Sequence, residues 1–268
     1  MSMTILVTGS TDGIGLETAK ALREKGHTVL LHGRNLQKLE AAKADLLKIP
    51  SSADVEAFQS DFSKLAEVTR MAAEIRKRHE RIDVLINNAG IFRTPVELTD
   101  DGLDIRFVVN LLAPYLLTRE LLPLMDGSSR VVNLSSAAQA PVSLDALEGQ
   151  VRLSPMDAYA QSKLALTMWT RFLAGVLGAE GPVVVAVNPG SLLASKMVKE
   201  GFGVSGKDLG IGVDILLRAA LSDMFANATG KYFDNDGGRF SDPHPDGLSD
   251  TKTAKLMKAV EGLVSKAG

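Results

Sequence analysis

Tyr159 and Lys163 stand four residues apart in a helical pattern, so they share one face of a helix. A lysine ammonium close to a phenol favours the phenolate and lowers the tyrosine pKa. A tyrosine tuned in this way can serve as an acid or a base near neutral pH. The alternative is a structural pair in which the lysine stem covers the ring, and this spacing alone does not separate the two interpretations.

Three more polar residues could join this pair. Ser135 and Ser136 follow the predicted strand 130–134, where a hydroxyl can bond a substrate oxygen or cap a turn. Asn110 falls inside the apolar helical pattern 103–124. A buried amide costs free energy unless its hydrogen bonds are made. We therefore expect Asn110 either to tie neighbouring backbone or to hold a water.

A glycine-rich segment at 8–15 follows the apolar run 4–7 and opens a helical pattern from Leu16. Glycines permit a tight turn and a close backbone approach, and the free N–H groups of a helix start attract phosphate. An ordinary strand-turn-helix also uses glycines, so the pattern alone is weak evidence. Its place after the first strand favours a dinucleotide phosphate site. The predicted contacts are Gly9, Ser10, Asp12, Gly13, Ile14 and Gly15.

The end of the second predicted strand indicates which dinucleotide is bound. NAD sites usually carry an acid there for the ribose 2′-hydroxyl, but segment 32–35 has none and the first acid is Glu40. Arg34 instead offers a planar fork suited to a 2′-phosphate, although a solvated arginine is common at a helix start. We therefore expect NADP, with NAD the less favoured alternative. Ser10 could add a hydroxyl to the same phosphate.

Two further strand ends carry polar or small residues. Asp61 could accept from the adenine amino group with Phe62 beside the ring, or the same segment could cap a helix through Ser63. After the fourth strand, small residues allow a close backbone approach and an Asn amide can lock strand ends, although a plain turn is an equal alternative. The predicted contacts at these ends are Asp61, Phe62, Asn87, Asn88, Ala89 and Gly90.

Strand-like and helical patterns alternate along the chain, which predicts βαβ units. The strand-like runs are 4–7, 28–32, 55–59, 84–87, 130–134, 183–188 and 231–233. The helical patterns lie near 14–25, 35–48, 64–79, 100–125, 156–179, 207–224 and 250–266. We expect one α/β domain over 1–268, a Rossmann-type doubly wound parallel sheet of about seven strands with helices on both faces. Segment 190–206 is interpreted as a substrate lid and 234–268 as a C-terminal loop and helix.

Composition agrees with this class and excludes others. Of 268 residues, 45% are apolar and 5% aromatic, as in an aliphatic core around a covered parallel sheet. The net charge of -2, without a block of like charges, gives no nucleic-acid footprint. Without cysteine there are no disulfides or thiolate metal sites, and we predict no metal. No signal peptide or apolar run of roughly 18 residues is evident, so we expect a cytoplasmic protein without a membrane span.

Together and in this order, the motifs resemble those of the short-chain dehydrogenase/reductase family from Thr4 to about Phe233. The long offset between Ser136 and Tyr159 resembles the retinol-dehydrogenase-like branch, as does the tail at 230–233. The matching motifs are Thr8-Gly9-Ser10-Thr11-Asp12-Gly13-Ile14-Gly15, Asn87-Asn88-Ala89-Gly90, Asn110, Ser135-Ser136, Tyr159-Ala160-Gln161-Ser162-Lys163 and Asn188-Pro189-Gly190.

The resemblance implies an NADP(H)-dependent oxidoreductase that interconverts a carbonyl and an alcohol. Tyr159 would protonate the carbonyl oxygen as hydride arrives from NADPH. Lys163 would bind the nicotinamide ribose hydroxyls and lower the Tyr159 pKa, so both residues also count as cofactor contacts. Ser136 would orient the substrate, with Ser135 the alternative, and Asn110 would hold a water that links Lys163 to bulk solvent.

After the sixth strand, the resemblance implies cofactor contacts from Pro189, Gly190 and Leu192. Many relatives have a threonine four residues after this glycine, which contacts the cofactor. Here Ala194 takes that position and Ser195 follows it. The contact then falls to Ser195, to the Leu192 backbone, or to neither.

An apolar set near these motifs could wall a pocket over the nicotinamide. We expect a small-molecule carbonyl or secondary alcohol with a sizeable apolar part as the substrate. Alternatively, segment 191–204 is a short amphipathic helix packed on the sheet. A lid helix would combine the two interpretations, because it packs on the sheet and also walls the pocket. The apolar set is Ile91, Phe92, Leu192, Leu193, Met197, Val198 and Phe202.

Relatives often pair through helices that correspond to 100–125 and 156–179, so analogy predicts a homodimer or homotetramer. Two other functions compete with the oxidoreductase. A non-catalytic dinucleotide-binding sensor or scaffold would not need Tyr159, Lys163 and Ser136 together. The glycine spacing and the lack of a larger C-terminal substrate domain count against a nucleotide-sugar epimerase of the longer-chain type.

Overall fold

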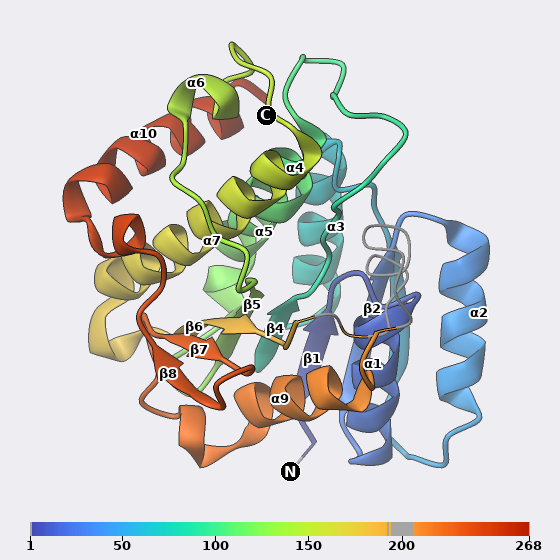
Figure 1. Ribbon diagram of the computed structural model, residues 1–268. Helices are drawn as coiled ribbons and strands as arrows, with labels where there is room; N and C mark the ends of the chain where they lie inside the picture. The colour runs from blue at the N-terminus through green and yellow to red at the C-terminus, as the bar shows by residue number, and fades with distance from the viewer. Residues whose placement is uncertain (1, 192, 194–205, 268) are drawn as a thin grey trace.

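The computed structural model describes residues 2–191, 193 and 206–267 (Figure 1). One sheet of eight strands runs through the middle in the order β3-β2-β1-β4-β5-β6-β7-β8, with helices on both faces. Strands β1 to β7 are parallel, and β8 is antiparallel to β7. The predicted doubly wound parallel sheet is confirmed, and its outer edge carries one more strand than the sequence indicates.

Seven strands lie where apolar runs predict them, and the eighth falls in a segment that was expected to be a loop. This strand has three residues, and its Phe240 ring packs 5.1 Å from Phe233 and 5.3 Å from Phe225. The strands are β1 (Thr4–Val7), β2 (Thr28–Gly33), β3 (Val55–Gln59), β4 (Val84–Asn87), β5 (Arg130–Leu134), β6 (Val183–Asn188), β7 (Tyr232–Asp234) and β8 (Arg239–Ser241).

The predicted helices are present with shifts at their ends, the largest at 100–125, where the helix begins at Ile105, and the short α6 (Leu144–Leu147) lies where no helix was expected. The helices are α1 (Gly13–Glu24), α2 (Leu36–Leu47), α3 (Leu65–Arg78), α4 (Ile105–Phe107), α5 (Ala113–Leu121), α6 (Leu144–Leu147), α7 (Pro155–Leu177), α9 (Gly210–Leu221) and α10 (Asp250–Ala267). Shorter turns are the π-helical η1 (Val108–Leu112) and the 3₁₀ segments η2 (Leu122–Leu124), η3 (Gly178–Glu180), η4 (Asp223–Phe225) and η5 (Pro245–Leu248).

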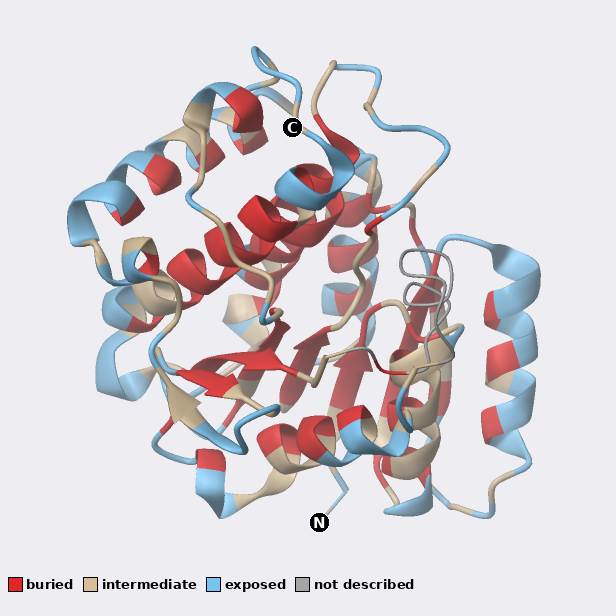
Figure 2. Ribbon diagram, viewed as in Figure 1, coloured by how far each residue is buried: buried red, intermediate tan, exposed pale blue. Residues whose placement is uncertain are grey.

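Two apolar layers sandwich the sheet, as Figure 2 shows by the burial of the strands and of the inward helix faces. Successive side chains of a strand point to opposite faces, so Ile5 and Val7 join the layer under α1, α2 and α9. Leu6 joins the other layer, to which α3, α5, α7 and α10 contribute. Since both faces are covered, the central strands are apolar throughout.

The run Ile105–Leu124 combines α4, η1, α5 and η2 in one nearly continuous helix. By length and composition it could cross a membrane, but 72% of its most apolar window is buried inside the protein. It packs on α3 and α7, and it supplies much of one apolar layer. This burial is that of a core helix.

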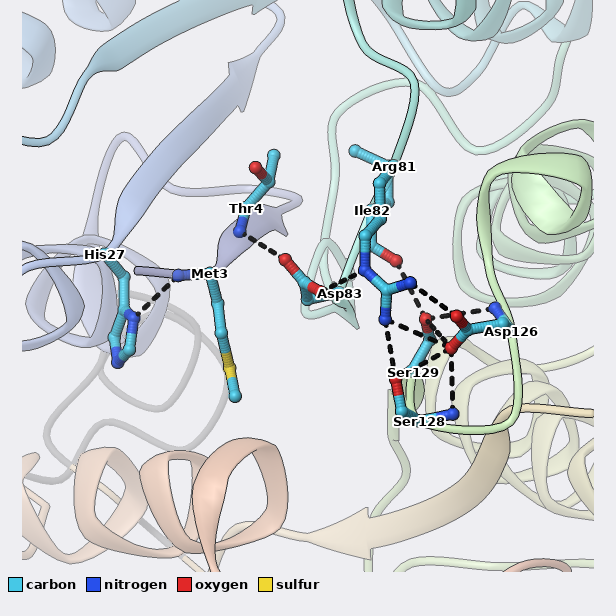
Figure 3. Close-up of polar contacts among 9 residues, drawn as sticks. All are labelled: Met3, Thr4, His27, Arg81, Ile82, Asp83, Asp126, Ser128 and Ser129. Carbon is cyan, nitrogen blue, oxygen red and sulfur yellow. Dashed lines mark hydrogen bonds and ion pairs between the residues drawn. The ribbon is translucent and has the colours of Figure 1, made fainter. Parts of the chain in front are cut away.

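A polar network joins the strands at their amino ends (Figure 3). Asp83, just before β4, accepts a hydrogen bond from the backbone N–H of Thr4 at 2.7 Å. Arg81 donates to Asp83 and pairs with Asp126, which precedes β5. The guanidinium holds the pKa of the Asp126 carboxyl below its usual range. This end of the sheet is thereby fixed, while the carboxyl ends carry the predicted site.

Candidate active site

The glycine-rich turn after β1 has no room for side chains. Gly9 has a φ of +63°, and a Cβ there would lie 2.8 Å from the Cα of Ala89. A Cβ on Gly15 would lie 2.3 Å from Nδ2 of Asn88, far inside contact distance. Gly13 starts α1 with a φ of +56°. Backbone conformation therefore favours glycine at positions 9 and 13, and packing against the segment after β4 requires it at positions 9 and 15.

Asn88 and Thr8 bind this turn to the end of β4. Nδ2 of Asn88 donates to the carbonyl oxygens of Thr8 at 2.8 Å and Gly9 at 3.0 Å. The Thr8 hydroxyl accepts from the N–H of Ala89 at 3.0 Å. Of the two interpretations of this segment, a plain turn or a lock between strand ends, the contacts support the lock.

Asn87 lies deeper and bonds in another direction. It is buried, and its Nδ2 donates to Oγ1 of Thr118 at 3.1 Å and to Oδ1 of Asn133 at 2.8 Å. Asn133 in turn donates to a threonine of α7. The side-chain amide therefore joins β4, β5 and the core helices, as expected of an amide that locks strand ends, and a cofactor contact by Asn87 stays a prediction.

The Ser10 hydroxyl points in a different direction from the one that the sequence suggested. Its side chain is 0% exposed, and its hydroxyl accepts from the N–H of His32 at 3.0 Å. A phosphate contact by Ser10 is therefore wrong for this structure, because the hydroxyl faces the β2 backbone. Phe62 is likewise only 4% exposed and stacks on the His32 ring, so it lies beneath the surface. The sequence did not indicate a role for His32, because its contacts are with residues distant in sequence.

Other predicted cofactor contacts lie at the carboxyl edge. Arg34 is exposed directly after β2. Asp61 is half-buried, and its Oδ1 accepts hydrogen bonds from the N–H and the hydroxyl of Ser63. These bonds form an Asx turn, which resembles the alternative interpretation of this segment as a helix cap. Asp12 caps α1 by accepting from the N–H of its first residue at 2.7 Å. Ile14 is half-buried in the α1–α9 layer.

The helix α7 carries the Tyr159–Lys163 pair. It begins at Pro155, where Ser154 accepts from the backbone N–H of Asp157 and satisfies a free donor of the first turn. Nζ of Lys163 lies 5.7 Å from the centroid of the Tyr159 ring, so the two residues share one helix face as predicted. On this face they meet the residues that follow β4 and β5.

Lys163 is a buried cation, 4% exposed. Its Nζ donates to the carbonyl oxygen of Leu134 at 2.7 Å, and burial lowers its pKa to about 8. A Cβ on Gly90 would lie 3.4 Å from this Nζ and 3.3 Å from Oδ1 of Asn110. The glycine therefore leaves backbone open beside the ammonium, where a ligand can approach closely.

The pKa of Tyr159 differs from the expectation. Burial raises it above that of an ordinary tyrosine, and a hydrogen bond with the Ser136 side chain opposes the shift without reversing it. In the cofactor-free protein the direction is therefore opposite to the expected lowering, because loss of solvation is the largest contribution.

The structure separates the two adjacent serines. Ser135 is buried, bonds the Thr167 hydroxyl at 2.7 Å and donates to the Lys163 carbonyl oxygen at 3.3 Å. Ser136 faces Tyr159 instead, and its backbone oxygen accepts from the Tyr232 hydroxyl at 3.1 Å. Ser136 is therefore the serine that faces Tyr159, and Ser135 fixes the end of β5 to α7.

Asn110 lies in the π-helical η1, a type of helix irregularity that is frequent at functional sites. Its Oδ1 accepts from the N–H of Ile91 at 2.8 Å, and its Nδ2 donates to the Ile91 oxygen at 3.0 Å. Nδ2 also donates to Ser162 on α7 at 2.9 Å. Of the two predicted roles, the structure supports the tie to neighbouring backbone.

The segment after β6 is held by the turn between β7 and β8. Nδ2 of Asn188 donates to Asp234 at 2.8 Å and Asp236 at 2.9 Å, and Pro189 accepts from a side chain of the same turn. Gly190 has a φ of +118°. Leu193 of the expected pocket wall is buried. The other residues predicted in this segment lie outside the described residues; they are Leu192, Ala194, Ser195, Met197, Val198 and Phe202.

A buried arginine is tied to the segment that follows β4. Arg106 is 1% exposed, and its guanidinium donates to Asp104 through Nε at 2.9 Å and Nη2 at 2.7 Å. Its Nη1 donates to the carbonyl oxygen of Phe92 at 3.4 Å. The Phe92 ring packs 5.2 Å from the Tyr159 ring. The sequence did not indicate these contacts of Arg106, because only the fold shows that its guanidinium is buried.

We expect Arg106→Met to lower the free energy of unfolding by about 3–5 kcal/mol, since it leaves the Asp104 carboxylate buried without its partner. Urea unfolding measures this loss. Arg218→Met is the control, because Arg218 pairs with Asp214 on the surface and its loss should cost less than about 1 kcal/mol. Equal losses in the two variants would contradict a special role for the buried pair.

Comparisons with known proteins agree with this geometry. A family model described as short chain dehydrogenase matches residues 3–202. Retinol dehydrogenase 13 of Homo sapiens is 34% identical over 280 residues, which cover 97% of this chain and 84% of that protein.

Two solved structures also resemble the chain over most of its length. An uncharacterized protein from Mycobacterium paratuberculosis has a TM-score of 0.80 and 30% identity, with 98% of this chain and 93% of that chain covered. A short chain dehydrogenase from Shigella flexneri complexed with NADP has a TM-score of 0.69 and 26% identity, with 87% and 97% covered. The chain therefore belongs to the short-chain dehydrogenase family, in its retinol-dehydrogenase-like branch.

Proposed function

We propose that this protein is an NADP(H)-dependent oxidoreductase that interconverts a carbonyl and an alcohol on a largely apolar small molecule. The observation that carries the proposal is the group formed by Tyr159, Ser136 and Lys163 at the carboxyl edge of the sheet. A phenol bonded to a serine hydroxyl, with a buried ammonium nearby, suits proton transfer to a carbonyl oxygen.

The residues present fit a nicotinamide dinucleotide. The turn containing Gly9 and Gly15 packs tightly on the segment after β4 and leads into the N-terminus of α1, where free N–H groups attract phosphate. The open backbone at Gly90 lies beside the Lys163 ammonium, which can donate to ribose hydroxyls. When bound, the dinucleotide supplies the hydride. The residues that would hold it are Gly9, Gly13, Gly15, Arg34, Asp61, Gly90, Lys163, Pro189 and Gly190.

The three site residues divide the acid–base work. The raised pKa of Tyr159 keeps its hydroxyl protonated at neutral pH, as a proton donor to a carbonyl oxygen requires. The Ser136 side chain forms a hydrogen bond with the Tyr159 side chain and can orient the substrate oxygen next to the Tyr159 hydroxyl. The Lys163 charge favours the phenolate once the proton has left. In the oxidising direction the same groups act in reverse.

The preference for NADP is inferred from Arg34. Its exposed guanidinium directly follows β2, and segment 32–35 contains no carboxylate for a ribose 2′-hydroxyl. A guanidinium matches the oxygens of a phosphate with two parallel donors. The similarity to the Shigella flexneri dehydrogenase complexed with NADP supports the same choice.

An apolar substrate is inferred from the residues beside Tyr159. The ring of Phe92 packs against it, and Ile91 is held next to the site by Asn110. The relative named retinol dehydrogenase 13 has a name that refers to an alcohol with a large apolar part. We therefore expect turnover of bulky apolar ketones, aldehydes or alcohols in preference to small charged carbonyls.

The deciding experiment is a screen of NADPH oxidation with a broad ketone and aldehyde panel, followed by Tyr159→Phe with the best substrate. We expect kcat to fall by about 10²–10⁴, the usual contribution of a general acid. NADPH affinity, measured by fluorescence, should stay within about threefold. A wild-type protein that binds NADPH without turnover of any panel member would instead support the sensor or scaffold function.

The adjacent serines give a matched pair. We expect Ser136→Ala to lower kcat by about 10²-fold, as for the loss of one hydrogen-bond donor to a reacting oxygen. Ser135→Ala should keep kcat but lower the free energy of unfolding by about 1 kcal/mol, since it removes a buried bond to α7. Steady-state kinetics and urea unfolding check both. A reversed pattern would return the role to Ser135.

Arg34→Ala tests the cofactor preference. We expect it to weaken NADPH binding by about 1.5–3 kcal/mol, the range for a hydrogen bond to a charged group, and to leave NADH binding nearly unchanged. Titrations of both cofactors against wild type and variant give the four affinities. An equal loss for both cofactors would show that Arg34 does not bind the 2′-phosphate.

A further inference from the structure

The ring of His32 connects three strand ends. His32 lies near the end of β2, and its side chain is 3% exposed. Its Nδ1 accepts from the backbone N–H of Gly9, after β1, at 3.0 Å. Its Nε2 lies 3.0 Å from the carbonyl oxygen of Ser60, after β3. Because Nδ1 must accept, Nε2 carries the proton and donates to Ser60.

The same residue contacts the neighbours of these atoms. Its backbone exchanges hydrogen bonds with Ser10, and its ring stacks on Phe62 at 4.0 Å between centroids and 21° between planes. Burial lowers its pKa to about 4, while Asp61, the charged group that faces it, acts in the opposite direction. At neutral pH the ring is uncharged, so the Nδ1 lone pair remains available to Gly9.

We propose that His32 is a positioning residue of the dinucleotide site, whose Nδ1 holds the glycine-rich turn in the shape that binds the cofactor. This inference rests on the proposed function. Gly9 starts the turn, and its conformation at positive φ sets the course of the chain into α1. With its N–H directed inward at the ring, the turn needs no reorganisation to bind a ligand, and preorganisation of this kind raises affinity.

A second histidine supplies a matched control. Nδ1 of His27 accepts from the backbone N–H of Met3 at 3.2 Å, at the amino end of the same sheet (Figure 3). The two bonds are alike in type, since each joins a histidine near β2 to backbone near β1. They differ in place, because the bond of His27 lies at the edge away from the glycine-rich turn.

The test uses two substitutions of His32 that separate its two nitrogens. His32→Asn places an amide oxygen near the Nδ1 position and keeps an acceptor for Gly9. His32→Gln places its amide near the Nε2 position, so it keeps a donor to Ser60 and loses that acceptor. Both variants lose the stacked ring, and His27→Gln is the control. The measurements are NADPH affinity by fluorescence, and amide hydrogen exchange of segment 9–15 in the cofactor-free protein.

We expect His32→Gln to weaken NADPH binding about tenfold and to speed exchange in segment 9–15. His32→Asn should stay within about threefold of wild type in affinity, and His27→Gln should change neither measurement at this segment. The inference is overturned if His32→Gln leaves exchange in segment 9–15 unchanged, or if His32→Asn and His32→Gln behave alike. It is also overturned if His27→Gln reproduces the effects of His32→Gln, which would show general loosening.

The two measurements keep this inference distinct from the proposed function. Exchange reports on the turn without any cofactor, so it decides the role of His32 even in a protein that binds no NADPH. Failure of the wild type to bind NADPH would count against the proposed function alone. Normal binding by the wild type and by His32→Gln would count against the positioning role alone.

Discussion

The site depends on a lysine ammonium kept away from water. Lys163 is buried, and among the described residues its recorded hydrogen bond is to the carbonyl oxygen of Leu134. Burial of a charge without an opposite charge is costly, which is why its pKa falls. The elements around it serve to hold it there: Asn110 fixes the segment after β4, and Ser135 fixes the end of β5 to α7. Strongly perturbed groups of this kind are typical of functional sites.

Local pattern was sufficient for the fold and for the grouping of Tyr159 with Lys163 on one helix face. Parallel strands covered on both faces are apolar throughout, so β1 to β6 stood out as runs, and amphipathic spacing gave the helices. The four-residue spacing of Tyr159 and Lys163 places them on one face of any helix. Strand β8 was missed because three residues after two glycines, Gly237 and Gly238, carry too little pattern.

Side-chain direction could not be predicted, because it depends on residues distant in sequence. The bond from Gly9 to His32 spans 23 positions, and that from Ser135 to Thr167 spans 32. Ser10 was assigned to a phosphate for its hydroxyl, yet packing turns that hydroxyl inward. The Tyr159 pKa depends on the fold in the same way: the spacing to Lys163 is evident in the sequence, but the burial that raises the pKa is not.

The hairpin of β7 and β8 has a consequence for self-association. An uncovered outer strand presents unpaired N–H and C=O groups to other chains, which invites aggregation by strand addition. Here β8 occupies the outer side of β7, is only three residues long and starts with the exposed Arg239. A second copy therefore cannot extend the sheet through β7 without first displacing β8, and the short charged rim offers a poor template for fibril growth.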